Sequence, residues 1–218
     1  NGGYPVDFYN AVGLDDVIDK FPEPVLKVGE VVGNISAEAA EIFGLSKKTV
    51  VVEGTADCNA CMFGVGGVRP NGMTLIGGTS TCLLGLSEEE FHVDGVNGTY
   101  PNCMYDGTSL LEGGQTAAGS ILTWFKNNLL PAAWMQEAVN RNMNIYDLIT
   151  EKASAVPIGC DGLVMMDYFQ GNRAPYADSK ARGMFWGLSI GTTPAHLARA
   201  VYEGVAYGAN HCIVSMKK

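Results

Sequence analysis

The sequence predicts an α/β fold, and three observations lead to this class. Strand-like apolar runs alternate with segments whose apolar residues have helical spacing. With 47% apolar and 17% charged residues, the 218-residue chain can bury a sizeable core and fits one large domain or parts of two. Its 28 glycines cluster where strands and helices meet, which indicates tight turns near a ligand.

The first fifty residues predict short elements. Residues 12–21 suit a short amphipathic helix that the following prolines end. Ser36 is placed to cap a second helix over residues 37–43, and Gly44 stands where a left-handed C-cap belongs. The run 49–52 follows as a buried strand.

The next segment puts a carboxylate at a strand-to-helix turn. Asp57 falls at the entrance of a helix predicted over residues 58–65. Further on, residues 73–76 and 81–84 have the composition of strands and flank the Gly-Gly-Thr-Ser run 77–80. This pattern predicts a glycine-bearing β-hairpin.

The second half predicts longer helices and a mixed sheet. Residues 113–130 begin with two glycines and continue as a helix, a second helix covers 145–155, and a strand covers 162–168. Thr193 caps a long helix over 194–215, whose small residues recur every four positions, so we expect this face to pack against another helix. These small residues are Ala200, Gly204 and Gly208.

The charge balance restricts the class of ligand. A formal net charge of −9 argues against unaided binding to nucleic acid or an anionic membrane, because both demand clustered Lys and Arg. An anionic ligand such as ATP would need local help from backbone N–H groups, helix N-termini and a metal ion. No apolar run reaches the roughly 20 residues of a membrane span. The six cysteines are interpreted as reduced thiols of a cytoplasmic protein.

Three stretches stand in a fixed order along the chain. The first is Gly-Thr-Ala-Asp at 54–57, and the second joins the run 77–80 to residues 112–124. The third runs Gly-Met-Phe-Trp-Gly-Leu at 183–188 and continues, after seven residues, at 196–203. Together they resemble the FGGY carbohydrate kinases, the group with glycerol kinase, xylulokinase and ribulokinase in the actin and Hsp70-like (ribonuclease H-like) ATPase superfamily.

The resemblance implies an internal fragment of such a kinase. The amino-terminal phosphate hairpin and the carboxy-terminal adenosine segment of the family are not matched in the sequence. Residues 1–70 would complete the sugar-binding domain, and residues 71–218 would form most of the ATP-binding domain, with the chemistry in the cleft between them. We expect the fragment alone to be inactive or nearly so. Because relatives are often dimers, a homodimer is a further expectation.

The resemblance also assigns roles in phosphorylation of a sugar hydroxyl, of a pentulose or related polyol, by ATP and Mg²⁺. Asp57 is expected to be the general base, and Cys58 to touch the sugar. The remaining ATP contacts are expected at Thr79, Ser80, Gly119 and Thr123. Without the resemblance, an ordinary N-cap aspartate at Asp57 and a plain hairpin turn at 77–80 are the better interpretations, and the alternative for Gly119 and Thr123 is helix packing.

Two other functions stay open. The first is a non-catalytic nucleotide-binding module on the same scaffold. The second is thiol or metal chemistry at the CxxC pair Cys58 and Cys61, although burial as small apolar side chains is the commoner fate of such cysteines. Arg173, His196 and Glu203 are interpreted as structural polar residues.

Overall fold

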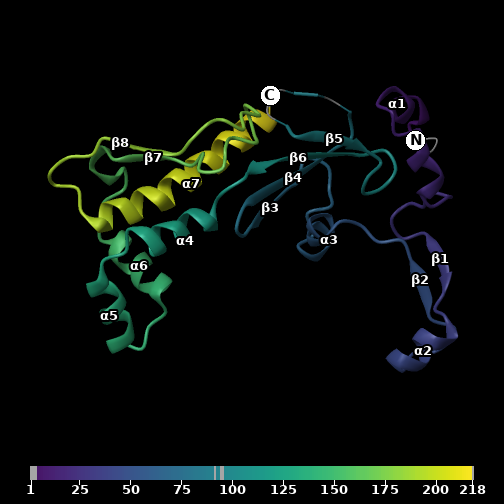
Figure 1. The fold of residues 1–218 in the computed structure, drawn as a ribbon, viewed down its shortest axis with the longest axis horizontal. Helices are drawn as coiled ribbons and strands as arrows, with labels where there is room; N and C mark the ends of the chain where they lie inside the picture. The colour runs from purple at the N-terminus through teal and green to yellow at the C-terminus, as the bar shows by residue number, and fades with distance from the viewer. Residues whose placement is uncertain (1–3, 91, 94–95, 218) are drawn as a thin grey trace. The chain divides into compact units, whose positions relative to one another are not determined.

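The computed structural model describes residues 4–90, 92–93 and 96–217, and the chain divides into two compact units (Figure 1). The first unit ends at Ala56 and the second begins at Asp57. Every residue predicted for the site therefore belongs to the second unit. Within the described part of the chain, no helix combines the length and apolarity needed to cross a membrane.

The first unit holds short elements around a two-stranded antiparallel sheet. Their bounds are α1 Val6–Ala11, the 3-10 helix η1 Asp15–Lys20, β1 Val31–Asn34, α2 Ala37–Phe43 and β2 Val50–Val52. The helix predicted over 12–21 is confirmed only in part: residues 15–20 form the 3-10 helix η1, and Gly13, whose φ of 72° lies in the left-handed region, separates it from α1. The α1 helix ends before this glycine and η1 begins after it.

Capping in α2 is confirmed, whereas the burial predicted for the next strand is wrong. Ser36 Oγ accepts a hydrogen bond from the Ala39 N–H at 3.1 Å, and Gly44 has a φ of 66°. Strand β2 exists, but its valines are between 41% and 52% exposed. It pairs with β1 alone, so the sheet of this unit has no central strand to bury.

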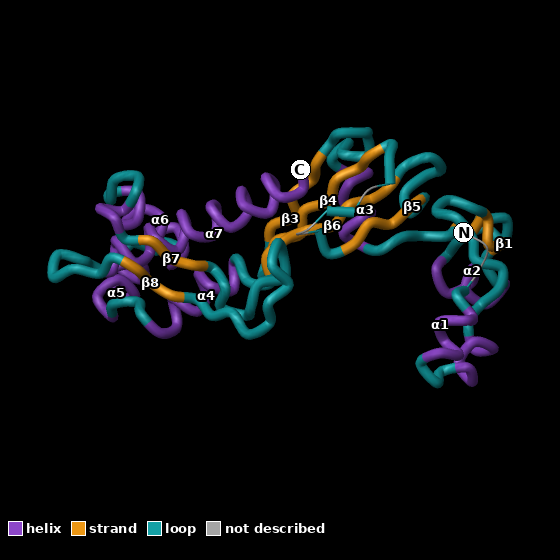
Figure 2. Tube along the Cα trace, turned by 90° about the horizontal axis from the view of Figure 1, so that it is seen from above, coloured by secondary structure: helices purple, strands orange, loops and turns teal. Residues whose placement is uncertain are grey.

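The second unit is built on a four-stranded antiparallel sheet in the order β3-β4-β6-β5 (Figures 1 and 2). The strands are β3 Met73–Gly77, β4 Thr81–Ser87, β5 Gly98–Pro101 and β6 Ser109–Gln115. The predicted hairpin is confirmed, since Gly77 pairs with Thr81 at its closed end. The expected mixed sheet is not seen among the described strands, whose pairings are all antiparallel.

A helix covers each face of this sheet. Leu84 and Leu86 of β4 pack with Met62 of α3 (Asp57–Gly64), whereas Leu83 packs with Cys212 of α7 (Pro194–Met216) on the other face. This follows from the alternation of side chains along a strand. The sheet thus anchors the helix that Asp57 begins.

The remaining elements pack around the first half of α7. They are α4 Gly119–Asn128, α5 Ala132–Asn140, α6 Ile145–Ser154, the 3-10 helix η2 Cys160–Gly162, β7 Val164–Met166 and β8 Met184–Trp186. Helix α5 was not predicted. The helix predicted over 113–130 is too long, because residues up to Gln115 extend strand β6 and pair with β4.

Helix α7 packs against other helices, as expected, but Gly204 on its small-residue face meets a strand. A Cβ at Gly204 would lie 2.5 Å from the carbonyl oxygen of Met165 in β7, closer than side chains pack. Helices α4 and α6 also contact α7. Both α7 and α4 contribute to the largest core, for example Val201 and Phe125. The glycines therefore let a strand backbone approach the helix.

Candidate active site

The turn between β3 and β4 lies directly against the start of α4. The carbonyl of Thr79 accepts hydrogen bonds from the N–H groups of Ala118 at 2.9 Å and Ser120 at 3.1 Å. The carbonyl of Gly78 accepts one from the Gly119 N–H at 3.0 Å. Two segments predicted to contact ATP, 40 residues apart in sequence, are thus joined through their backbones.

Gly119 is required by this contact. A Cβ at this position would lie 2.6 Å from the Gly78 carbonyl oxygen, a distance that real side chains do not tolerate. Because the turn carbonyls occupy these N–H groups, the same groups are not available to a phosphate. A nucleotide at this place would have to use the exposed side of the turn.

Thr79 and Ser80 form that exposed side of the turn. The turn is closed by the Gly78 N–H, which donates to the Ser80 carbonyl at 2.9 Å. In the described part of the chain, neither hydroxyl is seen to hydrogen bond with another group. Both hydroxyls can therefore face a ligand.

Asp57 is the first residue of α3 and is exposed. Its Oδ1 accepts a hydrogen bond from the Cys58 N–H at 2.7 Å. The carboxylate is therefore oriented by the first turn of α3. One carboxylate oxygen is engaged locally, as in an ordinary N-terminal aspartate.

Cys58 is half-buried, and its side chain hydrogen bonds with Asn59. Its Sγ donates to Asn59 Oδ1 at 3.6 Å, and the Asn59 amide donates to Cys103 Sγ at 3.6 Å. Cys61 is exposed. All six cysteines are free thiols, and no cluster of His, Cys, Asp or Glu among the described residues could hold a metal. Cys82 and Cys103, which the sequence did not single out, share the environment of Cys58.

Thr123 lies one turn after Gly119 and is exposed. Its Oγ1 stands 3.2 Å from the hydroxyl of Tyr146 in α6. The hydrogen bond from Thr123 is the largest cause that lowers the pKa of Tyr146, and Lys126, 5.3 Å from the ring centroid, adds to it. Thr123 thus has a packing role besides the predicted ATP contact.

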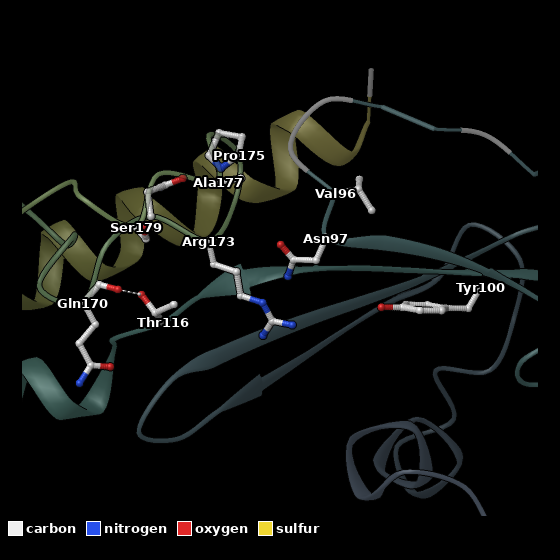
Figure 3. Close-up of a pocket in the computed structure, with 10 residues that line it drawn as sticks. Val96, Asn97, Tyr100, Thr116, Gln170, Arg173, Pro175, Ala177 and Ser179 are labelled. Carbon is white, nitrogen blue, oxygen red and sulfur yellow. Dashed lines mark hydrogen bonds between the residues drawn. The ribbon is translucent and has the colours of Figure 1, made fainter. Parts of the chain in front are cut away.

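Arg173 braces its loop, as the structural interpretation expects. Its guanidinium forms an ion pair with Glu112 of β6, and the Tyr100 hydroxyl also donates to Glu112 at 3.4 Å. Thr116 Oγ1 donates to the Gln170 carbonyl at 3.3 Å, as Figure 3 shows. A hollow of about 560 Å³ opens between the strands and this loop. It is lined by Val96, Asn97, Tyr100, Thr116, Gln170, Asn172, Arg173, Pro175, Ala177 and Ser179.

His196 and Glu203 also make structural contacts. The His196 Nδ1 lies 2.6 Å from Thr193 Oγ1 and completes the cap of α7, while Nε2 lies 3.2 Å from Asp161 Oδ2. Glu203 accepts hydrogen bonds from the Gly159 N–H at 3.2 Å and from Arg199 Nε at 2.7 Å. Both side chains anchor α7 to the η2 region.

A buried polar pair was missed by sequence reasoning. Gln115 Nε2 donates to Asp167 Oδ2 at 2.6 Å and to the Val205 carbonyl at 3.0 Å. Burial is the largest cause that raises the pKa of Asp167 above its ordinary value, although the Gln115 hydrogen bond opposes it. The one sequence signal was Gly208, where a Cβ would lie 2.3 Å from Asp167 Oδ2.

Comparison with known proteins gives the family. The model of the FGGY family of carbohydrate kinases, C-terminal domain, matches residues 73–218. "Ribulokinase 2" of Staphylococcus saprophyticus subsp. saprophyticus is 34% identical over 209 residues, which are 94% of this chain and 38% of the relative. A ribulokinase of Staphylococcus aureus has the same identity and coverage. The chain therefore spans well under half of these relatives.

Solved structures give the fold. The xylulose kinase from Rhodospirillum rubrum superposes with a TM-score of 0.78 at 29% identity, over 95% of this chain and 40% of that one. The gluconate kinase from Lactobacillus acidophilus has a TM-score of 0.80 at 22% identity, over 98% and 41%, and shows the fold alone. The actin and Hsp70-like ATPase fold expected from the motifs is confirmed. With a family model matching two thirds of its length, this chain belongs to the FGGY family of carbohydrate kinases.

Proposed function

We propose that the chain takes part in the ATP-dependent phosphorylation of a sugar hydroxyl, with Asp57 as the general base. The observation that carries this proposal is the set of backbone hydrogen bonds between the β3–β4 turn and the start of α4. They fix the backbone of the exposed Thr79 and Ser80. The proposed acceptor is a pentulose or related polyol, because the relatives above are named for ribulose and xylulose.

Each residue has a defined part in this proposal. Phosphoryl transfer needs in-line positioning, charge neutralisation and a carboxylate that accepts the alcohol proton. Asp57, held at the start of α3 by the Cys58 N–H, supplies the carboxylate, and Cys58 touches the sugar. Thr79 and Ser80 donate to phosphate oxygens, Gly119 keeps the turn in place, and Thr123 lies on the nucleotide side of α4.

The proposed cofactors are ATP and Mg²⁺, and the residues fit them. Mg²⁺ is usually held by one or two carboxylates together with substrate phosphates and water, so it needs no cage of protein ligands. The exposed Asp57 carboxylate and the hydroxyls of the turn meet that requirement. When bound, the ion neutralises charge on the phosphates.

The domain assignment is part of the proposal. Residues 1–70 are assigned to the sugar-binding domain and residues 71–218 to the ATP-binding domain. Because the chain spans only 38% to 41% of the relatives above, we propose that it turns over little ATP by itself. We also propose a homodimer, because relatives in this family are often dimers.

A sugar panel tests the function. ADP release would be measured with the complete gene product, with and without each sugar, and compared between wild type and Asp57→Asn. A positioned base contributes roughly 10²–10⁴-fold, so we expect a sugar-dependent rate that falls by about 100-fold or more in the variant. Tight nucleotide binding without any sugar-dependent rate in either protein would instead favour the non-catalytic nucleotide-binding module.

A further inference from the structure

Gln115 lies where three elements of the second unit meet. It is the last residue of β6 and is 5% exposed. Its Nε2 donates to Oδ2 of Asp167, which follows β7, at 2.6 Å and to the carbonyl oxygen of Val205 in α7 at 3.0 Å. An amide nitrogen carries two N–H donors, so these two hydrogen bonds use both of them. The side chain of Gln115 therefore ties the end of β6 to β7 and to α7.

The backbone of α7 encloses the pair of Gln115 and Asp167. A Cβ at Gly208 would lie 2.3 Å from Asp167 Oδ2 and 2.5 Å from Gln115 Nε2, so the helix lies directly on their hydrogen bond. Asp167 is 7% exposed. Because both side chains are buried, loss of one would leave the other without its partner, which is the costly case for a polar group. The two side chains therefore act together.

The backbone around Gln115 supports the β3–β4 turn from two sides. In the register of β4 and β6, Gln115 pairs with Thr81, which directly follows the turn. Just beyond Gln115, the N–H groups of residues 118–120 donate to carbonyls of the turn at 2.9 to 3.1 Å. Residues 79–81 and 115–118 thus form a closed ring of backbone, and the Gln115 side chain ties this ring to β7 and α7.

We propose that Gln115 and Asp167 are positioning residues for the nucleotide site, which hold the turn of Thr79 and Ser80 in place without touching a ligand. Asp167 fixes the Gln115 amide, and Gln115 fixes the ring of backbone that carries both hydroxyls. Groups that bind phosphate must be held within about 0.5 Å of the productive geometry, so loss of this support weakens binding. The role rests on the proposed function, because it concerns the nucleotide site proposed there.

Amide proton shifts of the 218-residue chain, measured by NMR, test whether Gln115 holds the turn. Gln115→Met keeps the length of the side chain and removes both donors. We expect the amide protons of residues 118–120 to shift upfield, because their hydrogen bonds to the turn lengthen, while those of residues 84–86 in β4 stay in place. The shifts report on the folded state, so a lower stability by itself does not produce them. Should Gln115→Met fail to fold, Gly208→Ala displaces the same pair from the side of α7 and should give the same shifts.

Binding of ADP with Mg²⁺ by the complete gene product, measured by calorimetry, tests the effect on the nucleotide. We expect Gln115→Met and Asp167→Leu to raise the Kd for ADP about 10-fold, since a displacement of about 1 Å at a positioned group can cost up to about 100-fold. In turnover, the KM for ATP should rise while the KM for the sugar stays unchanged. Asp167→Asn keeps an acceptor oxygen for the Gln115 amide, so it should bind ADP nearly as well as wild type.

Glu203→Met is the matched control. It removes another polar anchor of α7, whose partners are Gly159 and Arg199, so it should lower stability without shifting the amides of residues 118–120 or changing the Kd for ADP. Unshifted amides in Gln115→Met, or an equal rise in Kd in Gln115→Met and Glu203→Met, would overturn the positioning role alone. A wild-type protein that binds no ADP would overturn the proposed function, and the positioning role with it.

Discussion

Replacing Gly119 by alanine tests the joint between the β3–β4 turn and α4. The new Cβ would lie 2.6 Å from the Gly78 carbonyl oxygen and 3.3 Å from its carbon. The obstacle is backbone held by three hydrogen bonds from residues 118–120, so it cannot rotate away as a side chain would. Either the turn moves and these bonds lengthen, or the start of α4 shifts.

The magnitude follows from two opposing effects. Overpacking of this kind costs about 1–3 kcal/mol, and a glycine-to-alanine change in a helix returns up to about 1 kcal/mol, less at a terminal position. We therefore expect Gly119→Ala to lower the free energy of unfolding by about 1–2 kcal/mol. For a chain of this size this corresponds to a fall in Tm of about 2–8 °C.

The assay is urea unfolding followed by tryptophan fluorescence. It reports on the second unit, because the three tryptophans are Trp124, Trp134 and Trp186. Gly64→Ala is the matched control, since Gly64 ends α3 and a Cβ there meets nothing within 4 Å. The control should be neutral or slightly stabilising. If Gly119→Ala were as stable as Gly64→Ala, the close approach of turn and helix would be refuted.

Three further predictions concern the second unit. Gly204→Ala should lower unfolding stability by about 1–3 kcal/mol, since its Cβ would meet a β7 carbonyl at 2.5 Å; an unchanged urea midpoint would contradict this packing. Burial raises the pKa of Asp167 in the folded state. The contribution of Asp167 to the stability of the folded state is therefore highest below the unfolded-state pKa near 3.8, and it falls as pH rises through the folded-state pKa. Asp167→Asn should therefore gain stability relative to wild type between about pH 4 and 7, and parallel urea midpoints at those pH values would count against a raised pKa. Arg173→Ala and Glu112→Gln should each cost about 1 kcal/mol or less and together little more than either alone; additive losses in the double-mutant cycle would mean that the ion pair does not couple them.

Local patterns predicted the elements whose ends are encoded by single residues. Ser36 and Gly44 bound α2, and Thr193 opens α7, because capping depends on hydrogen bonds within a few residues. The hairpin around residues 77–80 was predicted for the same reason. The helix predicted over 12–21 is shorter than its apolar spacing indicates, because Gly13 adopts a left-handed conformation before it.

For the candidate site, too, the sequence predicted some features and the structure alone gave others. The motifs named Asp57, Thr79, Ser80 and Gly119, and the family that they indicated is confirmed by the match over residues 73–218. The sequence did not predict which residues become neighbours. The CxxC pattern pointed to Cys61, whereas Cys58 packs against the same core as Cys82 and Cys103. Partners from different strands are set by sheet register, which no local spacing encodes.

The sequence by itself determined the family and the order of its motifs. Only the tertiary structure decided how the backbone groups are used. The N–H groups at the start of α4 bind the turn carbonyls, and Gly119 is demanded by that contact. Likewise the glycine face of α7 admits strand β7 and the buried pair Gln115 and Asp167. The physical reason is that a glycine lets any backbone segment approach closely. Packing between distant parts of the chain determines which segment lies against it.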